Sequence, residues 1–331
     1  MQAVLYRRYG PPDVLEYTES EKPVPAAGEV LIRVHAASVN PYDWHFLRGT
    51  PSFIRVFTGI AKPKSPRLGA DLAGVVESVG PQVVRLKVGD AVFGTGRGTF
   101  AQYACAKETE LALKPEIISY EQAASVPIAG ITALQGLRDS GSVQSGQTVV
   151  INGAAGGVGT FAVQIAASFG ARVTGVCSTR NVELVRSLGA ARVIDYTREN
   201  FTNSTERYDA IFDLAGSRSL ADFRRSLKPN GVFIGCGGGG PDRSSASLLA
   251  GLLGRALLSP FSSQGLKGVL AKINTADLNV LGGMMSMGKI KPVIDRSYAL
   301  AQTADAIRYV ETCHARGKVI IAVPWHQSNA I

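Results

Sequence analysis

The sequence predicts an α/β protein with two parts, a β-rich N-terminal region and a doubly wound parallel sheet. Three observations lead to this expectation. Short apolar runs separated by Gly and Pro fill the region before residue 120, strand-like and helix-like segments alternate after Gln122, and a glycine-rich loop joins one strand to one helix. A chain of 331 residues is long enough to bury two hydrophobic cores.

The N-terminal region has the pattern of a β-rich domain. Residues 29–39, EVLIRVHAASV, alternate apolar and polar side chains as a half-buried strand does. Further short runs of this kind, separated by Gly and Pro, cover residues 71–80, 89–95 and 99–107. We therefore expect a sheet of short strands before residue 120.

From Gln122 onward the pattern changes. A helical stretch at residues 121–137 is broken near Pro127, and apolar strands then alternate with helices. This alternation predicts βαβ units in a parallel sheet with helices on both faces. The strand-like runs are residues 148–152, 172–177, 191–196, 208–216, 231–239, 267–273, 291–298 and 318–323, and the later helical runs are 275–290 and 303–317.

The composition, with 45% hydrophobic and 18% charged residues, is that of an ordinary globular protein. Residues 246–261 form an apolar run that is too short to span a bilayer and contains Arg255, so we expect a buried or pocket-lining helix. The first residues resemble neither a secretory signal nor a transit peptide. The four cysteines are far apart, without a CxxC pair, which favours a reducing compartment. We therefore expect a cytoplasmic protein without a membrane partner.

The net charge of +9 raises the question of an anionic partner. Most of the excess is dispersed, but five basic residues occur between Asp43 and Asp71 without an intervening acid: Arg48, Arg55, Lys62, Lys64 and Arg67. This stretch is either a solvated loop or a rim that attracts a phosphate-bearing ligand. Because the chain has no RNA-binding motif and no basic run interleaved with aromatics, a nucleic acid is not the expected partner.

The glycine-rich loop GAAGGV follows the apolar strand at 148–152 and precedes a helix that places Phe161 and Ile165 on one face. A helix N-terminus offers unpaired N–H groups and a positive dipole end. A pyrophosphate lies on those groups only where no side chain blocks them, which explains Gly156, Gly157 and Gly159. The pattern is A-x-G-x-x-G, with Ala154 at the first position. In this strand–loop–helix context it predicts a dinucleotide site.

The end of the next strand indicates which dinucleotide binds. A site for NAD places an acid about 20 residues after the loop, to accept hydrogen bonds from the ribose 2′-OH. Here the strand ends in Cys177, Ser178, Thr179 and Arg180, and no acid occurs before Glu183. Hydroxyls and a guanidinium suit a 2′-phosphate. We therefore expect NADPH, with the alternative that Arg180 is only the exposed start of the next helix.

Together these residues resemble the medium-chain dehydrogenase/reductase superfamily, in its zinc-free quinone oxidoreductase (zeta-crystallin-like) branch. The resemblance covers nearly the whole chain, through the segments ASVNPYDW (37–44), LGADLAGVVESVG (68–80), GDAVFG (89–94), AGITALQGL (129–137), AAGGVG (154–159), VIDY (193–196) and GKIKPVID (288–295). It implies a GroES-like catalytic domain built from both chain ends, an inserted Rossmann domain and a homodimer. The implied division is 1–125 and 271–331 for the catalytic domain and 126–270 for the NADPH-binding domain.

The resemblance also assigns roles to positions. Asn40 and Thr132 resemble residues that hold the nicotinamide end. The pyrophosphate cradle is matched by Ala155, Gly156, Gly157 and Val158. Contacts to the 2′-phosphate and adenosine are matched by Ser178, Thr179, Arg180 and Tyr196, and the adenosine ribose by Leu214 and Ala215. For Tyr196 the alternative is an aromatic that caps the edge of the sheet.

A catalytic zinc is not expected. Such a site needs Cys, His and carboxylate ligands, usually three of them with a water. Zinc-dependent relatives carry a Cys near the VNPYDW segment and a His–Glu pair at the GADLAG segment, where this chain has Asn40, Ala70 and Asp71. The four histidines are scattered, and His45 is the one nearest the presumed site. We therefore expect no metal.

Without a Lewis acid, the expected chemistry is hydride transfer from NADPH to a carbon already activated by conjugation, as in quinones and α,β-unsaturated carbonyls. The expected substrate is a small hydrophobic electrophile. Tyr42 is the candidate catalytic proton donor, because it follows Asn40 in the loop after the strand. The alternatives for Tyr42 are a packing role beside Trp44, with a water or the ribose hydroxyl as donor.

Two other functions stay open from the sequence. An enoyl-thioester reductase would use the same cofactor, with the basic rim at 48–67 attracting a phosphate-bearing carrier. A non-catalytic NADPH-binding protein that interacts with RNA is the alternative from another class. Turnover of enones, enoyl thioesters and quinones, compared with RNA binding, separates the three.

Overall fold

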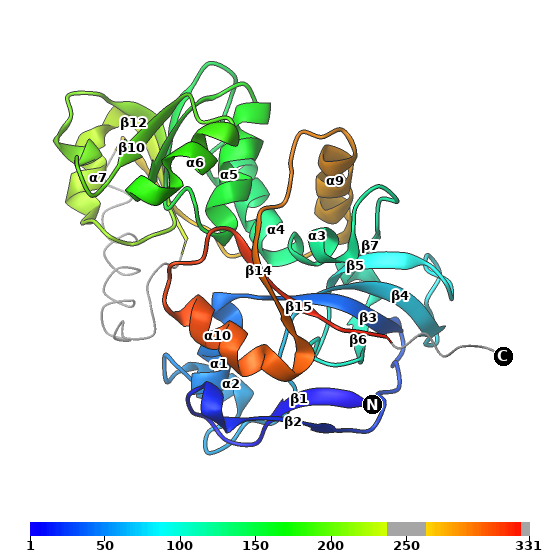
Figure 1. Cartoon of the computed structure of the whole chain (residues 1–331). Coiled ribbons are helices and arrows are strands. Elements are labelled where there is room, and N and C mark those ends of the chain that lie inside the picture. The colour runs from blue at the N-terminus through cyan, green and yellow to red at the C-terminus, as the bar shows by residue number, and fades with distance from the viewer. Residues whose placement is uncertain (237–262, 326–331) are drawn as a thin grey trace.

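The computed structural model describes residues 1–236 and 263–325, which form two large sheets with helices packed between them (Figure 1). One sheet holds the strands from the middle of the sequence. The other combines N-terminal strands with the last two strands described. A separate pair, β1 (Gln2–Tyr6) and β2 (Leu15–Glu19), lies beside the second sheet.

The first sheet has six parallel strands in the order β10-β9-β8-β11-β12-β13. Taken in chain order, this is the 3-2-1-4-5-6 arrangement of dinucleotide-binding folds, which reverses between the first and fourth strands. The reversal lies between β8 and β11. The strands are β8 (Thr148–Asn152), β9 (Arg172–Cys177), β10 (Arg192–Asp195), β11 (Tyr208–Asp213), β12 (Leu227–Gly235) and β13 (Gly265–Gly268).

Helices cover both faces of this sheet because the central strands are apolar on both faces. In β8, Val149 and Ile151 belong to the same buried cluster as Phe161 of α5, whereas Val150 belongs to the cluster of Phe223 in α7. The helices of the first face are α4 (Pro127–Gln135), α5 (Gly157–Ser168) and α6 (Val182–Ser187), and α7 (Leu220–Ser226) covers the second. The sheet is therefore a buried parallel sheet.

The second sheet has the strand order β14-β15-β3-β4-β5-β7, with β6 also pairing to β3. Strand β15 runs antiparallel to β3, so a late segment of the chain lies directly beside an early one (Figure 1). The strands are β3 (Glu29–Val39), β4 (Asp71–Val79), β5 (Ala91–Thr95), β6 (Tyr103–Lys107), β7 (Leu111–Leu113), β14 (Ile294–Ala299) and β15 (Lys318–Ala322).

The remaining helices in the described ranges lie around this second sheet and along its boundary with the first. They are α1 (Pro41–Arg48), α2 (Ile54–Thr58), α3 (Tyr120–Ala124), α9 (Thr275–Ser286) and α10 (Thr303–Glu311). Short helical turns are η1 (Pro12–Val14), η2 (Glu108–Glu110), η3 (Gly136–Ser140), η4 (Thr179–Asn181), η5 (Phe201–Asn203) and η7 (Leu300–Gln302).

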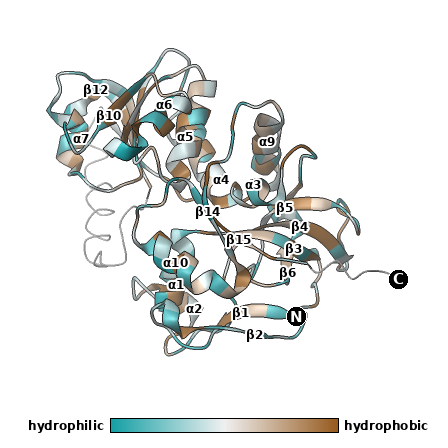
Figure 2. Ribbon diagram, viewed as in Figure 1, coloured by the Kyte–Doolittle hydropathy of each residue, from teal (hydrophilic) through white to brown (hydrophobic). Residues whose placement is uncertain are grey.

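One hydrophobic cluster spans both sheets. It contains Ala36, Phe93 and Ile320 from the second sheet, Ile151 from the first and Phe161 from helix α5, all fully buried. Figure 2 shows hydrophobic colour along strands such as β4, while α10 is largely hydrophilic on the side seen. Because apolar surface is removed from water across the boundary, the two sheets are fixed against each other by the main core.

The predicted fold class is confirmed, and most strand-like runs match observed strands. Tyr42, expected in the loop after the strand, lies in helix α1. The run at 267–273 is a strand only to Gly268, because β13 pairs with β12, which ends at Gly235. The expected helix at 246–261 lies outside the described residues. The division at residues 125 and 270 stays a prediction.

Candidate active site

The glycine-rich loop lies between β8 and α5, at the reversal of the strand order. It begins at Gly153, whose φ of +90° favours glycine. A Cβ added at Gly159 would lie 2.1 Å from the carbonyl oxygen of Gly153, so a glycine there is required by the packing of the loop on its own helix. The A-x-G-x-x-G pattern predicts that this glycine clears the backbone for a ligand, but the structure gives it a packing role.

Gly156 and Gly157 are less crowded by the rest of the chain than Gly159 is. A Cβ added at Gly156 would meet only the Gly153 oxygen, at an ordinary 3.4 Å, and one at Gly157 would lie 3.2 Å from Cδ of Lys318. Gly156 also precedes the first turn of α5. Since packing within the chain does not explain the bare backbone at Gly156, the loop fits a phosphate-bearing group at this helix N-terminus.

The other two cradle residues hold the loop in place. Ala155 is buried, and its carbonyl oxygen accepts a hydrogen bond from the N–H of Gly317 at 2.9 Å. Val158 is half-buried and packs against the main core. The cradle is thus attached to the segment before β15, which belongs to the other sheet.

Leu214 and Ala215 lie beside this loop. An added Cβ at Gly153 would lie 3.4 Å from Cβ of Leu214 and 3.6 Å from Cβ of Ala215. Asp213 at the end of β11 fixes the position of Leu214 and Ala215. Its Oδ1 accepts hydrogen bonds from Asn152 Nδ2 at 2.8 Å and from the Gly216 N–H at 3.0 Å. The structure therefore brings the predicted pyrophosphate and ribose residues together at the switch point.

Ser178, Thr179 and Arg180 follow β9 directly, and Tyr196 follows the neighbouring β10. The Tyr196 N–H donates to the Cys177 carbonyl at 3.0 Å, which places the four predicted residues at one edge of the sheet. Arg180 is exposed, and its guanidinium donates to the carbonyl of His314 at 2.8 Å. Ser178 is half-buried and accepts from Asn181 at 3.2 Å.

An acid also lies at this edge, although none follows β9 along the chain. Asp195 at the end of β10 accepts a hydrogen bond from the Thr179 hydroxyl and from the N–H and hydroxyl of Thr197. The hydrogen bond from Thr179 holds the pKa of Asp195 below its usual value. The Thr179 hydroxyl is therefore engaged with a carboxylate, which leaves Arg180 as the main candidate for a 2′-phosphate.

The predicted nicotinamide residues lie in the second sheet and in α4. Asn40 follows β3 and is 2% exposed. Its Nδ2 donates to Asp71 Oδ2 at 2.9 Å, and its Oδ1 accepts from Lys318 Nζ. Thr132 in α4 is buried, and its hydroxyl donates to the Ile128 carbonyl at 2.6 Å. The Ile128 N–H donates to Asp71 Oδ1 at 3.1 Å, so Asp71 connects both segments.

Tyr42 lies in the first turn of α1, two residues after Asn40, and is 44% exposed. Its ring packs on Phe46, with 4.1 Å between ring centroids. Partial burial and the nearby Asp43 raise the pKa of Tyr42 to about 12. The phenol is therefore protonated at neutral pH and available as a hydrogen-bond donor.

The residues at the positions of zinc ligands do not fit a zinc ion. Asn40 and Ala70 offer no thiolate or imidazole, and the ammonium of Lys318 lies 3.5 Å from Asp71 Oδ2, where it opposes a second cation. Within residues 1–236 and 263–325, no group of three or more His, Cys, Asp or Glu side chains could hold a metal. His45 bonds the Thr50 carbonyl through Nδ1 instead.

The basic stretch at 48–67 is largely used within the protein. Arg48 forms a two-point ion pair with Glu311 of α10. Arg55 lies over the ring of Tyr9 and donates to the carbonyls of Arg48 and Gly49. Arg67 donates to the Glu21 carbonyl at 2.8 Å. These contacts do not favour a rim for a phosphate-bearing carrier.

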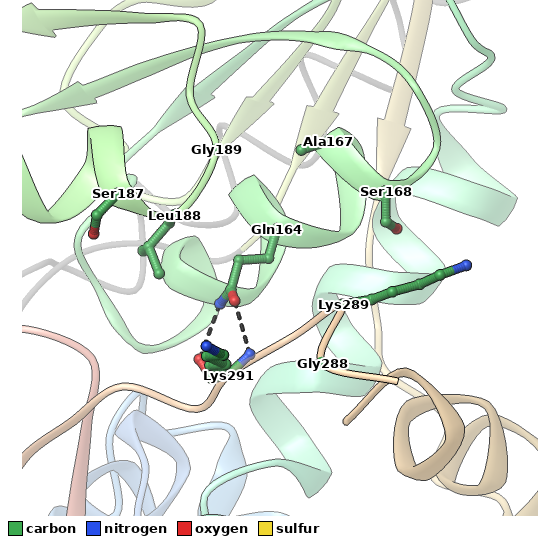
Figure 3. A pocket seen from close by; sticks show the side chains of 9 residues that line it. All are labelled: Gln164, Ala167, Ser168, Ser187, Leu188, Gly189, Gly288, Lys289 and Lys291. Carbon is green, nitrogen blue, oxygen red and sulfur yellow. Dashed lines mark hydrogen bonds between the residues drawn. The ribbon is translucent and has the colours of Figure 1, made fainter. Parts of the chain in front are cut away.

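A cavity of about 400 Å³ lies elsewhere, between the end of α5, the end of α6 and the segment before β14 (Figure 3). In its wall, the Gln164 side chain forms hydrogen bonds with the backbone of Lys291. The Lys289 side chain points away from the other lining residues. The lining contains none of the predicted cofactor residues: Gln164, Ala167, Ser168, Ser187, Leu188, Gly189, Gly288, Lys289 and Lys291. The cavity is therefore lined by residues other than those of the predicted cofactor site.

Comparisons with known proteins agree with this architecture. A family profile described as "Alcohol dehydrogenase GroES-like domain" matches residues 26–116, and one described as "Zinc-binding dehydrogenase" matches residues 188–321. A 2-methylene-furan-3-one reductase from Solanum lycopersicum is 36% identical, over 97% of this chain and 79% of the relative. An NADPH-dependent alkenal/one oxidoreductase from Arabidopsis thaliana is 35% identical over the same shares.

A solved structure supports the same assignment. The quinone oxidoreductase from Coxiella burnetii aligns with a TM-score of 0.85 and 31% identity, over 98% of this chain and 99% of that one. The chain belongs to the zinc-free quinone oxidoreductase family of the medium-chain dehydrogenases/reductases. It is an oxidoreductase that uses a nicotinamide cofactor and a small electrophilic substrate. In the described residues, no helix combines the length and the apolar character needed to cross a membrane.

Proposed function

We propose that this enzyme is an NADPH-dependent, metal-free reductase of quinones and α,β-unsaturated carbonyls. The observation that carries the proposal is the bare glycine loop at the switch point together with Arg180 at the end of the neighbouring strand. The relatives named above are enone, alkenal and quinone reductases, which supports this substrate class.

The chain's own residues would divide the work as follows. Backbone N–H groups of Gly157 and Val158 at the start of α5 would hold the pyrophosphate, with Leu214 and Ala215 beside the adenosine ribose. The Gly156 N–H already donates to the Gly153 carbonyl at 3.1 Å, so Gly156 would contribute its bare Cα rather than a donor. Arg180, with Ser178, would bind the 2′-phosphate, and Tyr196 would lie against the adenosine. Asn40 and Thr132 would hold the nicotinamide. When bound, NADPH supplies the hydride.

A conjugated carbonyl needs little further activation than orientation and a hydrogen-bond donor for its oxygen. The phenol of Tyr42, protonated and partly exposed beside Asn40, is the proposed donor. A zinc ion has no role in this scheme, because the side chains at the expected ligand positions are occupied by one another and by Lys318.

We also propose that the protein is a cytoplasmic homodimer. Strand β13 lies at the end of the six-stranded sheet in the described residues, and an edge strand is able to pair with that of a second copy. Several relatives are chloroplastic or mitochondrial by name, so fractionation of the native cell and light scattering of the pure protein are the measurements to make.

The proposal is tested by fluorescence titration with NADPH and NADH, followed by a panel of quinones, enones and enoyl thioesters assayed with and without a chelator. We expect tighter binding of NADPH, turnover of quinones and enones, and no loss of activity with the chelator. Equal affinity for the two cofactors, or inactivation by the chelator, contradicts the proposal. Binding without turnover of any electrophile, together with salt-sensitive RNA binding, indicates the non-catalytic alternative.

A further inference from the structure

We propose that Lys318 is a positioning residue that fixes the Asn40 amide for the nicotinamide end of the cofactor. This inference rests on the proposed function, since it takes Asn40 as a nicotinamide contact. Lys318 is the first residue of β15, about 280 positions after Asn40, and 3% of it is exposed.

The geometry leaves one orientation for the amide. Lys318 Nζ faces three oxygens, namely Asn40 Oδ1, the Val39 carbonyl at 3.3 Å and Asp71 Oδ2 at 3.5 Å. An ammonium only donates, and an ionised carboxylate only accepts. Asn40 must therefore direct Oδ1 to Lys318 and Nδ2 to Asp71, and the reverse orientation would oppose donor to donor and acceptor to acceptor.

The hydrogen-bond partners support the charged state of the pair. Asp71 is 0% exposed and receives three donors, from the Ser38 hydroxyl at 2.8 Å, Asn40 Nδ2 and the Ile128 N–H. Burial raises the pKa of Asp71 and lowers that of Lys318, and these contacts limit both shifts without reversing them. Burial raises the pKa of nearby Asp43 to about 8, so this second carboxyl is mostly neutral at pH 7. The cluster then balances one ammonium with one carboxylate.

The fixed amide has one group left for a ligand. Nδ2 uses its two hydrogens on Asp71 and, at 3.3 Å, on the Ser38 carbonyl. Oδ1 uses one lone pair on Lys318 and keeps a second. The group that matches a remaining acceptor is the carboxamide –NH₂ of a nicotinamide. Lys318 thus sets which end of the Asn40 amide is offered to the cofactor.

The same lysine contacts the elements that carry the rest of the site. Its stem lies against Gly157, where an added Cβ would be 3.2 Å from Cδ of Lys318. The preceding Gly317 N–H holds the Ala155 carbonyl. Through Asp71, the network also reaches the first turn of α4, which carries Thr132. The stem faces the cradle, whereas the ammonium faces Asn40 and Asp71, so replacing only the ammonium should affect the nicotinamide end more than the adenosine end.

The test compares two ligands that differ only in the nicotinamide, NADPH and 2′-phospho-ADP-ribose. Lys318→Met alone leaves Asp71 as an uncompensated buried charge and destabilises the fold, so the decisive variant is Lys318→Met combined with Asp71→Asn. We expect the double variant to unfold at a higher temperature than Lys318→Met. We expect its Kd for NADPH to rise about tenfold, the effect of one lost hydrogen bond, while its Kd for 2′-phospho-ADP-ribose stays within about twofold of wild type.

The control is Lys289→Met, an exposed lysine whose replacement changes the net charge as Lys318→Met alone does, and both of its dissociation constants should stay at the wild-type values. Unchanged NADPH affinity in the double variant overturns the positioning role. An equal loss of affinity for NADPH and for 2′-phospho-ADP-ribose overturns it too, because Lys318 would then act on the phosphates or on the whole cofactor site. A wild-type protein that binds 2′-phospho-ADP-ribose more tightly than NADH, but binds NADPH no more tightly than NADH, contradicts the proposed function itself. This outcome does not depend on the variants.

Discussion

Arg180 is the residue on which the choice between the two nicotinamide cofactors depends. Its guanidinium donates a hydrogen bond to the His314 carbonyl, and the hydroxyl of its neighbour Thr179 donates one to Asp195. We expect Arg180→Ala to raise the Kd for NADPH by about 10- to 100-fold, since hydrogen bonds to charged groups contribute roughly 1.5–3 kcal/mol. The Kd for NADH should not change. Fluorescence titration measures both.

Arg186→Ala is the matched control, because Arg186 is exposed on α6 and its side chain pairs with Glu183 of the same helix. It should leave both dissociation constants unchanged. A fall in NADH affinity as large as that for NADPH in Arg180→Ala would show that Arg180 holds the loop rather than the phosphate.

Tyr42 is the proposed donor to the substrate oxygen. We expect Tyr42→Phe to lower kcat for enones about 100-fold with little change in NADPH affinity, in line with the usual contribution of a general acid. Because the pKa of Tyr42 is about 12, its phenol stays protonated below that value, so the rate should show no loss from Tyr42 ionisation at pH 7–10. Stopped-flow assays across this range measure it.

Tyr17→Phe, at an exposed tyrosine of β2, is the control and should retain wild-type kcat. A kcat within about twofold of wild type in Tyr42→Phe would assign the proton to a water or to the ribose hydroxyl instead.

At the scale of elements, helix α9 is attached to the neighbouring segment at Gln135 and Arg138 through Asp277 in its first turn. Asp277 accepts hydrogen bonds from Arg138, Gln135 and Asn274, and its own N–H donates to Asn274 Oδ1. Burial by itself would raise the pKa of Asp277, but the donors outweigh it and hold the pKa at about 2. The folded pKa is below the unfolded one, so this stabilisation is present above about pH 4 and is lost as the pH falls toward 2.

We therefore expect Asp277→Asn to lower the unfolding temperature by a few degrees at pH 7, and this difference from wild type should shrink as the pH falls toward 2. Thermal denaturation followed by circular dichroism between pH 2 and 7 measures this difference. Asp305→Asn, at an exposed ion pair on α10, should have a much smaller effect. A pH-independent difference for Asp277→Asn would contradict the assigned pKa.

The elements with strong patterns were predictable from sequence, and the others were not. β8 and β9 have the expected bounds because their apolar runs are buried on both faces. Helix α1 was not predicted around Tyr42, although Pro41 at its first position is compatible with a helix start, since proline is common in the first turn of a helix. Likewise Asp195 could not be placed beside Thr179 from spacing, since β10 pairing brings them together.

For the whole molecule, the decisive contact joins the cofactor loop to the last strand. Gly317 has a φ of +95°, and an added Cβ would lie 2.3 Å from the Val293 carbonyl oxygen. We expect Gly317→Ala to destabilise the protein by about 1–3 kcal/mol and to weaken NADPH binding, because its N–H holds the Ala155 carbonyl. Calorimetry and cofactor titration measure the two effects.

Gly288→Ala is the control, because Gly288 also has a positive φ, +66°, but no atom within 4 Å of an added Cβ. It should leave NADPH affinity unchanged. If Gly317→Ala binds NADPH as tightly as wild type, the contact between the two sheets is not needed for the cofactor site.

The network of Asn40, Asp71 and Lys318 shows what long-range topology hides from sequence reading. The resemblance marked Asn40, and Asp71 was noted only as a position without zinc chemistry. Nothing in the pattern GKVII singles out Lys318, because a lysine at the start of a strand is usually solvated. Only the antiparallel pairing of β15 with β3 places its ammonium beside residues from the beginning of the chain.

This arrangement has a consequence for biosynthesis. Domains usually complete their folding in the order in which the ribosome releases them. Here Asp71 emerges early, but the ammonium that neutralises it is translated only after all six strands of the parallel sheet. The six-stranded sheet can therefore fold on the nascent chain before the second sheet receives strand β15 and the counter-charge of Asp71. Folding then begins in the middle of the sequence and is completed by joining its two flanking parts.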